Sequence, residues 1–430
     1  MKSISYFLFF FCFFVLSCSS PSETPIDPGG GEVTKPNILL VIADDMGKDA
    51  TPNFSEGIIK PNMSTLQSLI NSGVTFDNLW SYPVCTPTRA SILTGKYGVN
   101  TNVLEVGDVI STAETSLQSY INSNTNNEYA TAIIGKWHLS NNTSDPVNMG
   151  IDYFAGILSG GVPDYYNWTF IENGATSNST TYTTTKLTDT AIDWVGEQTK
   201  PWFLWMAYNA PHTPFHLAPN NLHSQGNLPT DEASINANPI PYYMSAIEAM
   251  DSELGRLLSS LSSEERANTV IIFIGDNGTP AKVAQNPYSR LTVKGTLYQG
   301  GVNVPMIVSG VDVNRLGERE DALVHTADLF TTIANIAGVS ASDIHNSKSF
   351  YPLLTSAAND DRSFVYTEKV AGYAIRNATY KLMKFENGDE EFYNLLIDPY
   401  ENNNLIGTIL STEATNEKAN LISEAIAIRN

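Results

Sequence analysis

One short stretch of the sequence places a sulfur nucleophile close to a guanidinium group. It reads Cys85-Thr86-Pro87-Thr88-Arg89 and continues as Ala-Ser-Ile-Leu-Thr-Gly. Proline suits the first turn of a helix and glycine suits its end, so a short helix is expected between Cys85 and Gly95. The positive end of that helix would face Cys85, which predicts a site for an anion. A lone cysteine can also be a small buried hydrophobic residue, and this alternative stays open here.

Five short apolar runs are each followed by polar side chains. Continuous apolar runs of this length are typical of strands that are buried on both faces. Because ligands bind beyond the carboxyl ends of parallel strands, we expect the polar groups to converge in one crevice. The runs and the groups that follow them are 37–42 with Asp44 and Asp45, 74–80 with Cys85, 129–134 with Lys136 and His138, 202–208 with His212, and 269–274 with Asp276 and Asn277.

Helical patterns lie between these runs. Apolar residues recur every three and four positions from Tyr243 to Leu261, and residues 187–195 and 322–336 repeat the pattern less regularly. Strands that alternate with helices predict an α/β fold, in which helices sandwich a large, mostly parallel sheet.

The last part of the chain has a different pattern. Short aromatic and β-branched segments at 364–366, 373–375, 380–385 and 392–395 are separated by turn signals such as Asn387-Gly388. They predict a small antiparallel sheet, closed by a helix over residues 415–428. We therefore expect a catalytic α/β domain over residues 36–345 and an α+β subdomain over residues 346–430.

Together these motifs resemble those of the type I, formylglycine-dependent sulfatases, which belong to the alkaline phosphatase superfamily. Cys-x-Pro-x-Arg with Ala-Ser-x-Leu-Thr-Gly is similar to the signature of that family, and Thr88 stands where many members have Ser or Ala. Further similar elements occur in the order of the family: Gly135-Lys136-Trp137-His138, Pro211-His212, Val293-Lys294-Gly295-Thr296, and Tyr393-Asn394-Leu395 with Asp398-Pro399. The resemblance covers nearly the whole chain after its N-terminal segment.

The resemblance implies a modified cysteine and a metal ion. In the family the signature cysteine is oxidised to formylglycine (3-oxoalanine), so Cys85 would need a formylglycine-generating or equivalent maturation enzyme. The implied ligands are oxygen atoms, which suit a hard cation such as Ca²⁺. The residues implied to bind Ca²⁺ are Asp44, Asp45, Asp276, Asn277 and the modified Cys85.

The resemblance also assigns the remaining catalytic roles. Arg89, Lys136 and Lys294 would hold the oxygens of a sulfate ester. His138 would orient and deprotonate the formylglycine hydroxyl, and His212, or Lys294 beside it, would protonate the leaving oxygen. Two further histidines lie near His212 in the sequence, and we expect them in a loop that binds substrate: His216 and His223.

The first 35 residues predict export and a lipid anchor. Residues 1–17 combine an early lysine with an apolar run at 6–16, which is typical of a signal peptide. Leu16-Ser17-Cys18 resembles a bacterial lipobox, which would make Cys18 the lipidated first residue; ordinary cleavage without a lipid is the alternative. Residues 18–35 then form a flexible tether that is rich in Ser, Pro and Gly. We expect an exported bacterial lipoprotein in the periplasm, on the outer membrane or on the cell surface.

Composition limits the partners of the protein. The chain has 24 Lys and Arg against 45 Asp and Glu, a net charge of −21, which argues against nucleic acid as a ligand because nucleic-acid binders carry basic surfaces. Of its 3 cysteines, Cys12 falls in the signal and Cys18 in the lipobox. Cys85 therefore has no partner for an internal disulfide.

The predicted function is that of a sulfatase, a sulfuric ester hydrolase that acts on a sulfated polysaccharide or its oligosaccharides. Tyr165, Tyr166 and Trp168, close to Gly160-Gly161, either stack on sugar rings or belong to the core. One alternative is a phosphodiesterase or phosphonate hydrolase of the same superfamily. Another is a non-catalytic relative that binds glycans at the cell surface, whose mark would be loss of Cys85 or of a calcium-binding acid; neither is lost.

Overall fold

The computed structural model describes Met1, residues 35–357 and residues 362–430. Residues Lys35–Asn430 form one compact unit. The predicted signal peptide, Cys18 and the tether up to residue 34 lie outside the described residues. Within the described part of the chain, no helix is long and apolar enough to cross a membrane.

The large sheet has ten strands in the order β10-β2-β9-β8-β1-β7-β3-β4-β5-β6. Five neighbours in its centre, from β8 through β1, β7 and β3 to β4, pair in parallel, whereas β9, β5 and β6 pair antiparallel to their neighbours. The five predicted strands are all present in this mixed sheet. The strands are β1 (Asn37–Ala43), β2 (Gly73–Trp80), β3 (Ala130–Lys136), β4 (Tyr153–Ile157), β5 (Trp168–Glu172), β6 (Ala175–Ser179), β7 (Trp202–Ala207), β8 (Thr269–Gly275), β9 (Asn303–Gly310) and β10 (Glu318–His325).

Strand β1 illustrates why continuous apolar runs form the centre of the sheet. All seven of its residues are buried. Leu39 and Val41 pack into the hydrophobic core on one face of the sheet, and Leu40 and Ile42 pack into the core on the other face. Successive side chains of a strand point to opposite faces, so a strand that is covered on both sides must be apolar throughout.

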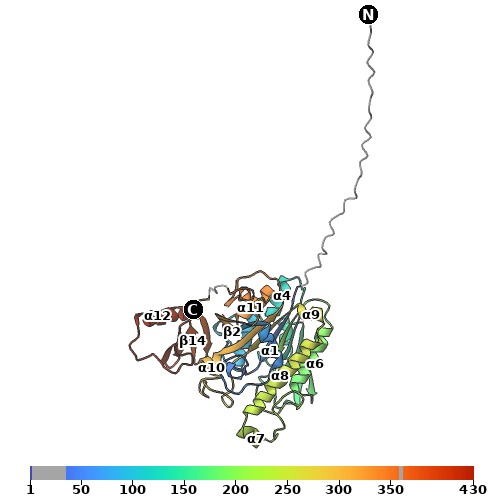
Figure 1. Ribbon diagram of the computed structural model, residues 1–430, viewed down its shortest axis with the longest axis horizontal. Coiled ribbons are helices and arrows are strands. Elements are labelled where there is room, and N and C mark those ends of the chain that lie inside the picture. The colour runs from blue at the N-terminus through green and yellow to red at the C-terminus, as the bar shows by residue number, and fades with distance from the viewer. Residues whose placement is uncertain (2–34, 358–361) are drawn as a thin grey trace. The chain divides into compact units, whose positions relative to one another are not determined.

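Helices cover both faces of the sheet (Figure 1). One core contains residues of α1 (Ser64–Asn71), α6 (Thr183–Gly196) and α8 (Ile240–Ser260), and the other contains residues of α2 (Cys85–Thr94), α4 (Leu117–Asn124) and α11 (Asp328–Ile336). The shorter elements are η1 (Lys48–Ala50), α3 (Gly98–Thr101), α5 (Asp145–Asn148), α7 (Glu232–Ala237), α9 (Ser263–Ala267), α10 (Gln299–Val302), β11 (Asp343–Ile344), β12 (Ser347–Lys348) and η2 (Tyr351–Leu354).

The helix predictions are confirmed for residues 187–195 and 243–261, which lie in or beside α6 and α8. The prediction for residues 322–336 was wrong for its first residues. Residues up to His325 belong to β10, where Val324 pairs with Leu79 of β2 in parallel. Only the part from Asp328 onward is helical, and it buries Leu329, Phe330 and Ile333 on one side. The short apolar stretch of β10 fits either pattern, and its pairing with an edge of the sheet decides between them.

The C-terminal residues form the predicted antiparallel sheet, in the order β13-β14-β15-β16. Its strands are β13 (Val365–Lys369), β14 (Gly372–Arg376), β15 (Tyr380–Phe385) and β16 (Glu390–Asn394), followed by the helix α12 (Thr412–Arg429). Val365 and Met383 share a core with Trp80 and Leu323 of the large sheet. The two sheets therefore pack against each other within one compact unit, and the boundary at residue 345 stays a prediction.

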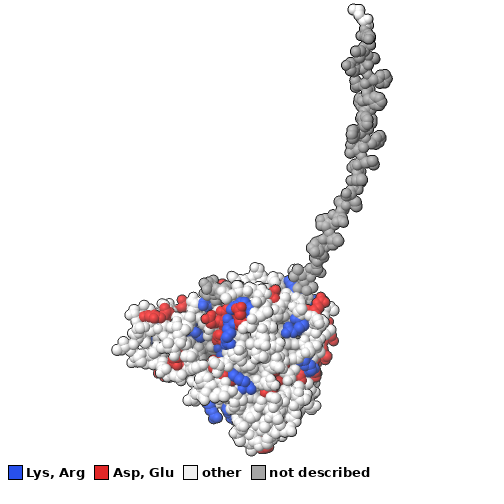
Figure 2. Space-filling view, viewed as in Figure 1, with Lys and Arg blue, Asp and Glu red and all other residues white. Residues whose placement is uncertain are grey.

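The visible surface carries few charges, in keeping with 16% charged residues in the whole chain. Figure 2 shows a face that is mostly uncharged, on which Lys and Arg side chains lie among Asp and Glu side chains. This face therefore has no large region of one sign.

We predict that Gly135→Ala separates β3 from β7. A Cβ at this position would lie 1.8 Å from the carbonyl oxygen of Ala207, and the φ of Gly135 is +120°. The free energy of unfolding should fall by about 3 kcal/mol, because backbone cannot move aside as a side chain can. Chemical denaturation measures it. In the control Gly196→Ala, the new Cβ meets no atom within 4 Å, so an equal loss in both variants would contradict the explanation.

Candidate active site

Two acidic strand ends meet at the carboxyl edge of the large sheet. Asp44 and Asp45 follow β1, and Asp276 and Asn277 follow its neighbour β8 in register, with Ala43 opposite Gly275. The backbone N–H of Asp45 donates to Oδ1 of Asp276 at 3.0 Å, and Nδ2 of Asn277 donates to Oδ1 of Asp45 at 2.8 Å. All four side chains are buried. The expected convergence of these groups therefore occurs, and it follows from the pairing of two central strands.

Cys85 is the first residue of α2, so the helix begins one residue earlier than the sequence suggested. The helix ends at Gly95, which has a φ of +68° and donates its N–H to the carbonyl of Ser91. The sulfur lies 3.1 Å from Nδ1 of His138 and 3.4 Å from Nζ of Lys136. Burial raises the pKa of the Cys85 thiol, although Lys136 opposes this. The unmodified side chain is therefore a neutral thiol near pH 7 and a weak nucleophile.

Arg89 and Lys136 join the cysteine to the acidic strand ends. Nη2 of Arg89 donates to Oδ2 of Asp276 at 2.7 Å, and Nη1 donates to the backbone oxygen of Lys136 at 2.8 Å. Nζ of Lys136 donates to Oδ2 of Asp44 at 2.6 Å. Because every partner is buried, these charges interact through a medium that screens them far less than water does.

The two buried carboxyl groups differ in their acidity. Burial favours the neutral form of Asp44, but Lys136, His212 and Arg89 outweigh burial and hold its pKa below the ordinary value. For Asp276, burial and the charge of Asp44 raise the pKa to about 6, in spite of Arg89. Two carboxylates that share one crevice cannot both ionise freely, so the crevice favours any further positive charge placed between them.

His138 is a neutral imidazole in direct contact with Cys85. Its φ is +55°, and its Nδ1 lies 3.1 Å from the sulfur of Cys85 and 3.3 Å from the hydroxyl oxygen of Thr86. Burial and Lys136 lower the pKa of His138 to about 3. The imidazole is therefore neutral near pH 7, and neutral imidazole can act as a base.

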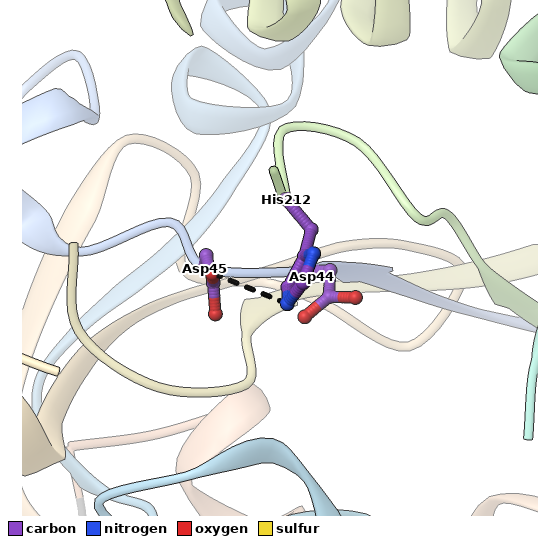
Figure 3. Close-up of side chains that lie close together, drawn as sticks. All are labelled: Asp44, Asp45 and His212. Carbon is purple, nitrogen blue, oxygen red and sulfur yellow. Dashed lines mark ion pairs between the residues drawn. The ribbon is translucent and has the colours of Figure 1, made fainter. Parts of the chain in front are cut away.

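His212 and Lys294 approach the site from its open side. Nδ1 of His212 donates to the carbonyl oxygen of Thr213 at 2.8 Å, and its Nε2 lies 3.7 Å from Oδ2 of Asp45 (Figure 3). Nζ of Lys294 lies 2.6 Å from a carboxylate oxygen of Asp45. Burial lowers the pKa of Lys294, but Asp45 and Asp44 outweigh it and raise the pKa above the ordinary value. All the predicted catalytic residues thus lie in one connected cluster.

The arrangement fits a hard metal ion. Among the described residues, Oδ1 of Asp44 and Oδ1 of Asn277 are buried oxygens without a hydrogen-bond partner. A buried acceptor without a donor is unfavourable, and a cation would satisfy both oxygens. Ligand atoms of Asp44, Cys85 and Asp276 lie within 4.8 Å of one another, as do those of Asp44, Asp45 and His212. The second group was not predicted, since His212 was assigned a proton-transfer role alone.

The two other predicted histidines have partners within the protein. Nε2 of His216 contacts the hydroxyl of Tyr182 at 2.9 Å, and its Nδ1 donates to the carbonyl of Pro214. Nε2 of His223 donates to the carbonyl of Ala218 at 3.0 Å, and its Nδ1 accepts from the backbone of Gln225. Their contacts organise the loop that follows His212, and their role in substrate binding stays a prediction.

The three aromatic residues after Gly160-Gly161 separate into two kinds. Tyr165 and Trp168 are buried in the core. The hydroxyl of Tyr165 donates to the backbone oxygen of His212 at 2.7 Å and so supports the segment that carries this histidine. Tyr166 is 40% exposed and is the member of the set that a ligand could reach.

Two glycines that the sequence did not single out for chemistry lie against the two histidines that are predicted to be catalytic, His138 and His212. A Cβ at Gly160 would lie 2.6 Å from Cε1 of His138, and one at Gly161 would lie 3.1 Å from Nδ1 of His212. Gly160 and His138 also line a small cavity of about 110 Å³. The two adjacent glycines were visible in the sequence, next to several aromatic residues. Only the folded structure shows that they pack against the imidazoles.

Comparison with known proteins identifies the family. The family model "Sulfatase" matches residues 36–339, and the model "N-sulphoglucosamine sulphohydrolase, C-terminal" matches residues 290–427. The chain belongs to the sulfatase family. Sulfatases generally use formylglycine and a metal ion, and the cluster around Cys85 offers a place for both.

The relatives of this sulfatase include proteins of different lengths. An uncharacterized sulfatase of Escherichia coli, YdeN, is 28% identical over 71% of this chain, which spans 63% of that protein. The ulvan-active sulfatase of Formosa agariphila is 26% identical, with 92% of this chain and 81% of the relative covered. The crystal structure of Ps i-CgsB in complex with k-i-k-neocarrahexaose matches with a TM-score of 0.76, 25% identity and 92% of both chains.

We predict that Gly160→Ala impairs turnover without unfolding the sulfatase. The new methyl group must displace the imidazole of His138 from Cys85, and a small misplacement of a catalytic group lowers rates about 10- to 100-fold. Hydrolysis of 4-nitrophenyl sulfate and thermal melting measure the two effects. Gly161→Ala is the graded comparison, since its Cβ contact with His212 is looser. Wild-type turnover by Gly160→Ala would refute the steric role.

Proposed function

We propose that the protein hydrolyses sulfate esters of a sulfated polysaccharide or its oligosaccharides. The observation that carries the proposal is the placement of Cys85 at the start of α2. It lies between Lys136 and His138, in the crevice where, among the described residues, buried oxygens of Asp44 and Asn277 have no hydrogen-bond partner. The names of the relatives support the substrate class: one is an ulvan-active sulfatase, and a structural neighbour was solved with a neocarrahexaose.

In this proposal Cys85 is converted by a maturation enzyme to formylglycine, whose hydrated aldehyde supplies a hydroxyl nucleophile where the thiol itself is weak. The side chains around it then have distinct tasks. Lys136, Arg89 and Lys294 bring three positive charges to the crevice and bind the sulfate oxygens, where negative charge must be stabilised. These charges are fixed by Asp44, Asp45 and Asp276, so they need little reorganisation during the reaction.

Proton transfer falls to the two histidines. One hydroxyl of the hydrated aldehyde attacks sulfur as the alcohol leaves. His138, in contact with residue 85, then accepts the proton of the second hydroxyl, which expels sulfate and restores the aldehyde. His212 lies on the open side of the cluster, with Lys294 near the same carboxylate of Asp45. Either group can donate a proton to the oxygen of the departing alcohol, which must carry away negative charge as the S–O bond breaks.

The metal ion of this proposal is Ca²⁺. Asp44, Asp45, Asp276 and Asn277 would hold it, together with the oxygen that replaces the sulfur at residue 85. When bound, a divalent cation stabilises negative charge on the sulfate group. The donor set supports a hard cation, because it consists of carboxylate and amide oxygens.

We further propose that the protein is an exported lipoprotein anchored through Cys18. Its lipobox and its signal-like segment support this location. An anchored position outside the cytoplasm suits an enzyme whose substrate is an external polymer.

We predict that the matured enzyme releases sulfate from at least one member of a panel of sulfated polysaccharides. Ion chromatography measures the sulfate. Cys85→Ala should abolish release while its melting temperature stays near that of the wild type, since the smaller side chain removes only the nucleophile. Hydrolysis of an aryl sulfate and of an aryl phosphate diester is measured in parallel. Efficient phosphodiester cleavage with no sulfate release from any glycan would refute the proposal and favour the phosphodiesterase alternative.

A further inference from the structure

A second cavity lies away from the catalytic cluster, where the C-terminal sheet meets the large sheet. Its volume is about 400 Å³, within the usual range for small-molecule sites. The walls come from η1 and the loop after it, from β2, β9 and β10, and from the C-terminal sheet and the turn after β16. In the described chain, none of the residues assigned to catalysis or metal binding lines this cavity.

Two buried cations line the cavity, and neither has a carboxylate partner in the described chain. Lys48 is 4% exposed, and its ammonium donates to the backbone oxygen of Asp77. Arg376 is 5% exposed, and its guanidinium donates to the amide oxygen of Asn78 at 3.1 Å and to two backbone oxygens. Burial lowers the pKa of Lys48 to about 8 and that of Arg376 to about 10. Buried charges normally have an ionic partner, so a ligand with negative charge would complete this site.

An unpartnered acceptor lines the same cavity. Asn303 is 8% exposed, and its Oδ1 has no hydrogen-bond donor among the described residues. This oxygen is fully enclosed, so it is not open to a ligand in the cavity. What the cavity offers is positive charge for an anionic group such as a sulfate ester.

Acids also lie near the two cations: Glu56 and Asp77 attract Lys48, and Glu401 attracts Arg376. Asp77 already forms an ion pair with Arg319, and both of these side chains are partly exposed. Glu56 accepts a weak hydrogen bond from Tyr288 at 3.5 Å, and Asp321 is exposed at the rim. In the view of Figure 2, side chains of both signs lie next to one another between the C-terminal sheet and β2. In the described chain, however, neither Lys48 nor Arg376 forms a direct ion pair with these acids, so both cations can still take an anionic partner.

We propose that this cavity is a second binding site for a sulfated sugar unit, which holds the polymer while another unit occupies the catalytic cluster. The inference rests on the proposed function for its substrate class. Lys48 and Arg376 contact the sulfate group. Such a site raises the local concentration of sulfate esters at the catalytic cluster without taking part in the chemistry.

The test measures binding rather than turnover, so it stands even if the proposed reaction fails. Dextran sulfate of defined length is titrated by calorimetry into the Cys85→Ala protein in about 0.15 M salt, where long-range electrostatics is screened. Adding Lys48→Gln should raise the dissociation constant about tenfold, which is the usual effect of losing one charged hydrogen bond. Arg290→Gln, at an exposed cation outside the cavity, should leave the affinity within about twofold.

Two variants at the mouth of the cavity give a second test in case Lys48→Gln does not fold. Ala378 is exposed and lines the cavity, so Ala378→Glu adds a negative charge at the mouth and Ala378→Gln adds the same bulk without charge. Ala378→Glu should weaken dextran sulfate binding about tenfold relative to Ala378→Gln. Equal affinities for this pair, or a loss by Arg290→Gln as large as that by Lys48→Gln, would overturn the proposal. Sulfate release from glycans by the wild type is scored separately and tests the proposed function alone.

Discussion

The protein buries three carboxylates in one crevice, and the rest of the catalytic site follows from the need to compensate them. Asp44, Asp45 and Asp276 are held together because β1 and β8 are adjacent and in register. Their mutual repulsion in a medium of low dielectric constant is large unless positive charges stand between them. Three cations from three other parts of the chain supply that charge: Arg89, Lys136 and Lys294.

This compensation also explains how an acidic protein can bind an anion. The net charge of the chain is −21, but the charges that matter lie within the crevice, and salt screens the remainder beyond roughly 10 Å. Each cation is fixed by a carboxylate and is therefore already oriented before substrate arrives. Among the described residues of this crevice, buried oxygens of Asp44 and Asn277 still lack a hydrogen-bond partner, and they mark where the compensation is incomplete. A divalent cation at that point would complete it.

Much of this arrangement could be predicted from the sequence, since apolar runs of six or seven residues followed by polar groups specify buried strands and their functional ends. The sequence alone could not predict which strands pair with each other, and β10 shows why. Its few apolar residues fit a helix or a strand, and only the free edge of β2 selects the strand. The C-terminal sheet was recognisable because its turns carry their own signals, such as Asn387-Gly388.

Features that depend on approach between distant segments escaped sequence analysis. The packing of Gly160 on His138 is of this kind, as is the cavity that brings Lys48 next to the C-terminal sheet. Nothing local distinguishes Lys48 from a surface lysine, or Arg376 from a solvated arginine at the end of a strand. Their burial without a direct ion pair in the described chain appears only when the two sheets pack together.

Calcium binding by the carboxylate cluster tests the central claim most directly. The matured protein is stripped with a chelator and titrated with Ca²⁺ by calorimetry, and the same titration is run on Asp44→Asn. The account predicts one Ca²⁺ per chain for the wild type, with recovery of the melting temperature and of aryl sulfate turnover. It also predicts at least about tenfold weaker binding by the variant, which loses one charged ligand. A stripped protein that binds no Ca²⁺ yet retains full sulfate ester turnover would contradict the account.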